Sequence, residues 1–156
     1  MSRIHRFCRM GGIMRIKPST LLIGLAAILV GIQLVPLSRT NPAVVQEPAW
    51  DSQETRALFM RACSDCHSNE SKWPAYAYVA PMSWLVVRHV NDGREAFNTS
   101  EFEYSGSRAV KLANSVAKQI ERGEMPLSSY LILHSEAKLT AAEKTALING
   151  VKASFK

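Results

Sequence analysis

Apolar residues after residue 50 recur at the three- and four-residue spacing of amphipathic helices. The pattern predicts four short helices within residues 51–63, 81–93, 107–123 and 140–155. Strict alternation of apolar and polar residues is weak throughout, and its best example is the short run SYLILH at residues 129–134. The sequence therefore predicts an all-α domain.

Capping residues mark the ends of these helices. Asp51 or Ser52 is expected to cap the first helix, and Thr140 with Glu143 forms a capping box for the last. Gly93 is expected to stop or kink the second helix. The apolar faces predicted to be buried hold Leu58, Phe59 and Ala62 in the first helix, Val110, Ala113, Val116, Ala117 and Ile120 in the third, and Leu147, Ile148, Val151 and Phe155 in the fourth.

A different pattern precedes this domain. Residues 20–37, TLLIGLAAILVGIQLVPL, carry no charge, and as a helix they would extend about 27 Å, close to the roughly 30 Å of a bilayer core. A basic leader, residues 1–19, stands before them. We expect a transmembrane signal anchor over 20–37, an extended tether over 38–49 with two prolines, and the folded domain over 50–156.

The positive charge lies mostly in the leader. The net charge is +6, yet the leader alone holds five Lys and Arg residues and no acid. The remaining 14 Lys and Arg residues nearly balance the 13 Asp and Glu residues. Without a basic stripe on the domain, we expect no nucleic-acid partner. The charge pattern instead predicts that the leader stays in the cytoplasm and the domain is translocated. No good cleavage site ends the apolar run, so an uncleaved anchor is expected, whether translation starts at Met1 or Met14.

The run ACSDCHSNESKWP contains Cys63, Cys66 and His67. A thioredoxin-like dithiol is expected at a helix N-terminus in a βαβ context, which this chain lacks. A structural zinc site needs four tetrahedral ligands. Beyond the three residues of the run, the domain offers only His89 and His134, without a second paired motif. Both interpretations are weak.

Cys-x-x-Cys-His is the attachment signature of a c-type haem. The two-residue gap lets one turn of chain bring Cys63 and Cys66 to the two vinyl groups on neighbouring edges of the porphyrin. His67 then falls under the iron as the proximal ligand. Carbonyl groups near Pro74 or Pro81 are the expected partners of its Nδ1–H. Attachment of such haems outside the cytoplasm agrees with the predicted translocation.

Met125 is the best-placed second ligand, because it stands in a turn after the third helix rather than on an apolar face. Gly123 frees the chain to leave the helix and Pro126 stiffens the loop. Among the rivals, Met60 stands too near the attachment site and Met82 belongs to a packing helix. His134 would give a bis-histidine centre, His89 is expected on a helix surface, and with no ligand the sixth position is open.

The runs CSDCHSNESKWP, APMSWL, GEMP and LTAAEK together resemble the haem-binding-domain family of small bacterial c-type cytochrome-like proteins. The similarity covers about residues 50–150. Its specificity comes from the Trp-Pro and Gly-Glu-Met-Pro segments, because the haem motif is common to all c-type cytochromes. One departure is HSEA at residues 134–137, where His-Pro is expected.

The resemblance implies a cytochrome-c-like bundle of about four short helices around a covalent haem c. It implies attachment through Cys63 and Cys66, with His67 and Met125 as the axial pair. Together with the anchor, this predicts a single-pass protein of the inner membrane whose haem domain faces the periplasm.

We expect a monohaem electron carrier that exchanges single electrons with redox partner proteins and is not an enzyme. The alternative is an open or displaceable sixth site with peroxidase or gas-sensing chemistry. A third interpretation is a haem with a mainly structural role.

Overall fold

The computed structural model describes residues 17–156, so most of the predicted leader lies outside the described residues. The chain divides into two compact units, residues 1–36 and 37–156. In the first, α1 (Pro18–Gly31) is followed by a 3₁₀ turn, η1 (Ile32–Leu34). The helix is shorter than the predicted run of residues 20–37, because Pro36 favours the extended backbone that Val35 adopts.

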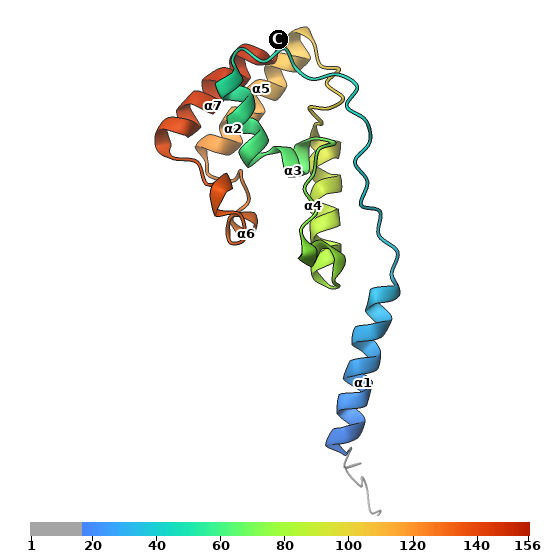
Figure 1. Cartoon of the computed structure of the whole chain (residues 1–156). Helices are drawn as coiled ribbons and strands as arrows, with labels where there is room; N and C mark the ends of the chain where they lie inside the picture. The colour runs from blue at the N-terminus through green and yellow to red at the C-terminus, as the bar shows by residue number, and fades with distance from the viewer. Residues whose placement is uncertain (1–16) are drawn as a thin grey trace, which may run out of the picture. The chain divides into compact units, whose positions relative to one another are not determined.

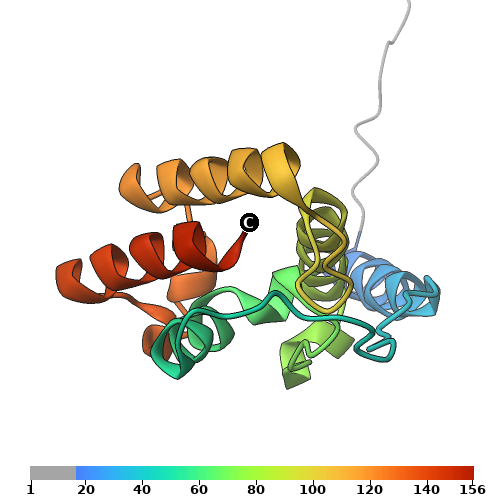
Figure 2. The ribbon, with the colours of Figure 1, turned by 90° about the horizontal axis from the view of Figure 1, so that it is seen from above.

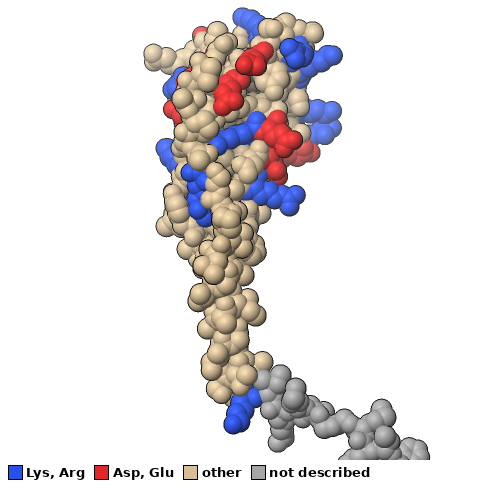
Figure 3. All heavy atoms as spheres, turned by 90° about the vertical axis from the view of Figure 1, so that its right-hand side faces the viewer, with Lys and Arg blue, Asp and Glu red and all other residues tan. Residues whose placement is uncertain are grey.

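Within residues 17–156, no helix combines the length and the apolar character needed to cross a membrane. α1 nevertheless buries none of its residues. Figure 3 shows no charged side chain along it, whereas Lys, Arg, Asp and Glu are spread over the surface of the second unit.

The second unit is all-α, as predicted, and residues 37–156 contain no extended strand. Only an isolated bridge joins Gln46 to Glu101. The helices are α2 (Gln53–Ala62), α3 (Ser64–His67), α4 (Met82–Ala96), α5 (Gly106–Glu121), α6 (Ser128–Leu131) and α7 (Ala141–Ser154), with 3₁₀ turns η2 (Ala75–Tyr78) and η3 (Ser135–Ala137).

Two groups of helices make up this unit. α7 packs against α5 on one side and α2 on the other, and Figure 2 shows the three side by side. α4 packs against α3 and η2 instead (Figure 1). α2 continues through Cys63 into α3, so the two groups meet at the Cys-x-x-Cys-His turn.

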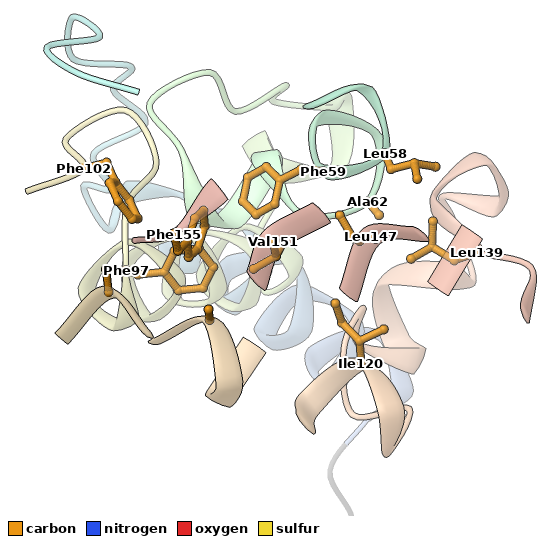
Figure 4. Close-up of a cluster of buried hydrophobic side chains, with 12 residues drawn as sticks. Leu58, Phe59, Ala62, Phe97, Phe102, Ile120, Leu139, Leu147, Val151 and Phe155 are labelled. Atoms are coloured by element: carbon orange, nitrogen blue, oxygen red, sulfur yellow. The ribbon is translucent and has the colours of Figure 1, made fainter. Parts of the chain in front are cut away.

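The hydrophobic core lies between α2, α5 and α7 (Figure 4). Phe59 and Phe155 are fully buried within it. Phe97, the residue after α4, reaches the same core. Its ring centroid lies 6.2 Å from that of Phe59 and 6.4 Å from that of Phe155. The core therefore connects directly to the end of α4.

The predicted caps are confirmed. The Ser52 hydroxyl accepts a hydrogen bond from the backbone N–H of Thr55 at 3.1 Å. Thr140 and Glu143 form both hydrogen bonds of the capping box. Gly123, with φ of 68°, lies just after α5 and turns the chain out of the helix, as expected.

The run SYLILH, the best candidate for a strand, begins in α6, in agreement with the all-α prediction. Two details differ from the prediction. Val110 is 49% exposed, because α5 turns Ala109, Ala113 and Ala117 toward the core instead. Gly93 does not end α4: it lies inside the helix, and its missing side chain lets the helix approach Cys66.

Residues 38–49 contain no helix, and they lie along the folded unit. The Arg39 guanidinium donates to the Ala77 carbonyl at 2.6 Å. Further along, the Val45 N–H donates to the Ser100 carbonyl at 2.8 Å. These hydrogen bonds explain why the second unit begins at Leu37.

Candidate functional site

A single turn of helix brings together the three residues of the Cys-x-x-Cys-His motif. Cys63 ends α2, and its carbonyl accepts hydrogen bonds from the N–H groups of Cys66 at 3.2 Å and His67 at 3.0 Å. The Ser64 hydroxyl binds back to the Met60 carbonyl at 2.5 Å and secures the junction of α2 and α3. All three motif residues line one pocket.

His67 is buried and held from two directions. Its Nδ1 lies 3.3 Å from the Phe97 carbonyl, and its ring stacks on the Phe97 ring with centroids 4.1 Å apart. Thr99 donates its N–H and its hydroxyl to the His67 carbonyl at 2.8 and 3.0 Å. The expected partners near Pro74 and Pro81 are therefore not the ones used.

The burial of His67 favours a neutral imidazole that can bind a metal. Burial lowers the pKa of His67, although hydrogen bonds to the Phe97 and Gly93 carbonyls oppose the shift. A metal ligand must be the neutral form of histidine. Because Nδ1 is turned to a backbone carbonyl, Nε2 is the nitrogen that a metal in the pocket would use.

The two thiols do not have the chemistry of a redox dithiol. Burial raises the pKa of Cys63 to about 12 and that of Cys66 to about 11. A reactive cysteine pair needs the opposite shift, toward the thiolate. Among the described residues, no three His, Cys, Asp or Glu side chains lie together so that they could hold a metal ion. These residues therefore provide no set of ligands for zinc.

The pocket has a volume of about 770 Å³ and is lined mainly by apolar side chains. This size falls within the usual range of cofactor sites. We call the side formed by α3, η2 and α4 the histidine wall. We call the side formed by α5, α6 and the loop around Met125 the methionine wall. α4 and α6 lie apart in Figure 1, and residues of both line the pocket.

Met125 lines the pocket from the loop between α5 and α6. Two consecutive N–H groups, those of Glu124 and Met125, donate to the Gln119 carbonyl at 3.0 and 3.2 Å. This anchors the start of the loop to the last turn of α5. His67 and Met125 therefore line the same pocket from different segments of the chain, His67 from α3 and Met125 from the loop after α5.

The rival ligands are less well placed. Met82 also lines the pocket, but it lies on α4, within the histidine wall. His89 lies on the same helix and is half-buried, and it too lines the pocket from the histidine wall. Both nitrogens of His134 have partners, the Tyr76 hydroxyl at 2.6 Å and the Glu136 carboxylate at 3.1 Å. Met60 packs on the hydrophobic core.

Several residues of the site were not predicted from the sequence. Phe97 and Gly93, which position His67 and Cys66, follow the motif by about thirty residues. Asp65 and Tyr130 line the pocket and are joined by a hydrogen bond of 2.7 Å. The one sequence feature that could have indicated Asp65 is its place as a polar residue inside the motif.

The comparison with known families decides the class of ligand. The model of the haem-binding domain matches residues 27–153, most of the chain. The chain belongs to this haem-binding family. The match confirms the resemblance drawn from the motifs. The chain matches no curated protein and no solved structure.

The pocket of this haem-binding domain fits a haem on its own geometry. A flat apolar ring needs a large apolar cavity, and the pocket has one. A nitrogen ligand needs a buried and oriented imidazole, which His67 supplies. Thioether attachment needs two thiols one turn apart beside that imidazole, and Cys63 and Cys66 are placed so.

Proposed function

We propose that this haem-binding domain is a c-type monohaem cytochrome that carries single electrons. Cys63 and Cys66 would attach the haem, and His67 and Met125 would be its axial ligands. The observation that supports this best is the pairing across the pocket. One turn presents two thiols and an imidazole from one wall, and a loop presents a thioether from the other.

The residues around the pocket suit an electron carrier. Bound haem supplies an iron that takes up and releases one electron. The chain holds His67 at fixed orientation through Phe97, and mainly apolar side chains line the pocket. A methionine ligand favours the reduced state and raises the reduction potential. Two protein ligands leave no position for a substrate.

An absorption spectrum of the purified, matured protein tests the ligation. We expect a low-spin spectrum with the weak methionine-to-iron charge-transfer band in the oxidised form. Met125→Leu should lose this band and lower the reduction potential, because the thioether ligand is gone. Met82→Leu is the matched control, since it removes the other thioether of the pocket, and it should keep the band. Loss of the band in Met82→Leu alone would refute the assignment.

The alternative function is an open or displaceable sixth site with peroxidase or gas-sensing chemistry. Met125 lies on a loop and is only half-buried, which supports a ligand that another molecule can displace. A high-spin oxidised spectrum, or immediate binding of carbon monoxide to the reduced protein, would support this function over electron transfer.

The proposed location is the cytoplasmic membrane, with the haem domain on its outer side and redox proteins as partners. It is supported by the uncharged run over residues 20–37, by the basic residues that precede it, and by the unburied apolar surface of α1. Removal of residues 1–37 should move the protein from the membrane fraction to the soluble fraction. A full-length protein that is already extracted by alkaline carbonate would contradict the anchor.

A further inference from the structure

Two hydrogen bonds join the histidine wall to α6 and to the segment that follows it. The Tyr130 hydroxyl on α6 donates to the Asp65 carboxylate in the Cys-x-x-Cys-His turn, at 2.7 Å. The Tyr76 hydroxyl in η2 lies 2.6 Å from Nε2 of His134, just beyond α6. Both tyrosines and Asp65 line the pocket. The segment that follows Met125 is therefore tied to the segment that carries His67.

The contact between Tyr130 and Asp65 is rigid on both sides. The second oxygen of Asp65 accepts from the Lys72 N–H at 2.9 Å, which fixes the carboxylate. The Tyr130 ring stacks on the His134 ring with centroids 4.1 Å apart and an angle of 11° between the planes. The hydroxyl is thus presented to the carboxylate by a held ring, and charge-assisted hydrogen bonds of this kind are stronger than neutral ones.

This contact lies at the far end of the loop that holds Met125. The near end is fixed by the Gln119 carbonyl, which binds the N–H groups of Glu124 and Met125. After the loop, the Leu127 carbonyl accepts from the N–H of Tyr130 at 3.0 Å, so α6 is a single turn closed on itself. Tyr130 then joins this turn to the opposite wall.

We propose that Tyr130 and Asp65 are positioning residues that keep Met125 across the pocket from His67. The inference rests on the proposed function, because it takes Met125 as the second axial ligand. With the Tyr130 hydroxyl removed, the loop keeps its near anchor and loses the nearer of its two far ties, while the bond between Tyr76 and His134 remains. Met125 then remains in place less firmly and is more easily displaced by another ligand.

Displacement by imidazole measures this effect on the full-length, matured protein. Imidazole is titrated into the oxidised protein while the methionine-to-iron charge-transfer band is followed. We expect Tyr130→Phe to bind imidazole about tenfold more tightly than the unchanged protein, the effect of losing one hydrogen bond to a charged group. Hydrogen exchange of the Tyr130 and Leu131 amides should also become faster.

The matched control is Tyr78→Phe. Tyr78 lies in η2 beside Tyr76, but its ring packs beneath the Arg39 guanidinium and it does not line the pocket. Its variant should bind imidazole like the unchanged protein. Asp65→Asn is the second variant. It should also bind imidazole more tightly, because it weakens the contact by removing the charge, and it tests the contact alone if Tyr130→Phe does not accumulate. Where both variants accumulate, the effect of Asp65→Asn should shrink in the double variant.

The outcomes separate the two proposals. If the unchanged protein shows the charge-transfer band and Tyr130→Phe binds imidazole with the same affinity as the unchanged protein, the positioning role is overturned. The proposed ligation by Met125 then still stands. A band that is absent from the unchanged protein overturns the Met125 ligation and the positioning role together. A band present, and tighter imidazole binding in Tyr130→Phe but not in Tyr78→Phe, supports both.

Discussion

The histidine wall is held by buried contacts, whereas the methionine wall ends in a loop on the surface. His67 is buried, stacks on Phe97, and receives two hydrogen bonds from Thr99 on its carbonyl. Met125 is half-buried, and the loop is fixed at its ends by backbone bonds to Gln119 and by Tyr130. Substitutions in the histidine wall should therefore lower the free energy of unfolding and the haem content. Substitutions in the methionine wall should first alter the ligation of the iron.

The same contrast separates the two residues proposed as axial ligands. His67 could not leave a bound iron without disturbing the core, because Phe97 packs against both His67 and the Phe59 ring. Met125 lies on a loop, so it could be replaced while the rest of the fold stays intact. In the proposed ligation, His67 is therefore the permanent ligand and Met125 the exchangeable one.

The largest effect is expected from Gly93→Ala in the histidine wall. A Cβ at this position would clash with the Cys66 carbonyl oxygen and would lie 2.9 Å from the Cys66 carbonyl carbon. α4 would have to move away from α3, and overpacking of this kind costs on the order of 3 kcal/mol. We expect a lower free energy of unfolding and a reduced haem-to-protein ratio, measured by denaturation and pyridine haemochrome absorbance.

Gly24→Ala is the control for this substitution. Gly24 lies inside a helix as Gly93 does, but a Cβ there would meet no atom within 4 Å. Its haem-to-protein ratio should equal that of the unchanged protein. Full haem content and unchanged stability in Gly93→Ala would show that the histidine wall is not tightly packed.

A smaller effect is expected when Thr99 loses its hydroxyl. Thr99→Val removes the 3.0 Å bond to the His67 carbonyl but keeps the backbone bond. The free energy of unfolding should fall by about 1 kcal/mol, since one buried hydrogen bond is lost. Thr145→Val, at an exposed position of α7, should change it by less than about 0.5 kcal/mol. Equal losses in the two variants would contradict the special role of Thr99.

Gly123→Ala compares stability with ligation in the methionine wall. Gly123 has φ of 68°, and an alanine in this left-handed conformation costs about 1 kcal/mol. Gly106, with φ of 54°, has the same left-handed conformation at the start of α5, away from the loop that holds Met125. Both variants should lose similar stability, but only Gly123→Ala should weaken the charge-transfer band. A weakened band in Gly106→Ala would mean that general destabilisation, not loop geometry, controls ligation.

The smallest effect concerns the stability of the domain at low pH, and it comes from Glu143 in the first turn of α7. The Thr140 backbone N–H, the Arg61 guanidinium and the Thr140 hydroxyl lower the pKa of Glu143 from its ordinary 4.5 to about 2. The resulting stability is present above pH 4.5 and is lost as the pH falls toward 2. Glu143→Gln should therefore flatten the fall in melting temperature between these values. An unchanged slope would remove Glu143 as its cause.

The sequence was sufficient to place the main helices of the domain, because their boundaries depend on local chemistry. Ser52 and the Thr140–Glu143 box act within one turn of their own helices. The cysteines and His67 were found for the same reason, since one turn of backbone brings them together. Met125 could be located in the chain from its turn residues, although the axial role remains a prediction.

The remaining features depend on contacts between distant segments. The packing of α3 on α4 places the Phe97 carbonyl beside His67. It also explains why α4 continues past Gly93, which lies against Cys66. The bond between Tyr130 and Asp65 joins residues 65 positions apart. Val110 looked like a core residue by spacing, but the alanine face of α5 packs more closely against α7. No local pattern distinguishes these cases.

Covalent attachment is tested most directly on a denaturing gel stained for haem peroxidase activity. The protein is produced in a host that matures c-type cytochromes, alongside a double variant, Cys63→Ala with Cys66→Ala. The account predicts a haem-stained band for the unchanged protein and none for the double variant, at equal protein load. An unchanged protein without the band, or a double variant that retains it, would contradict attachment through these two cysteines.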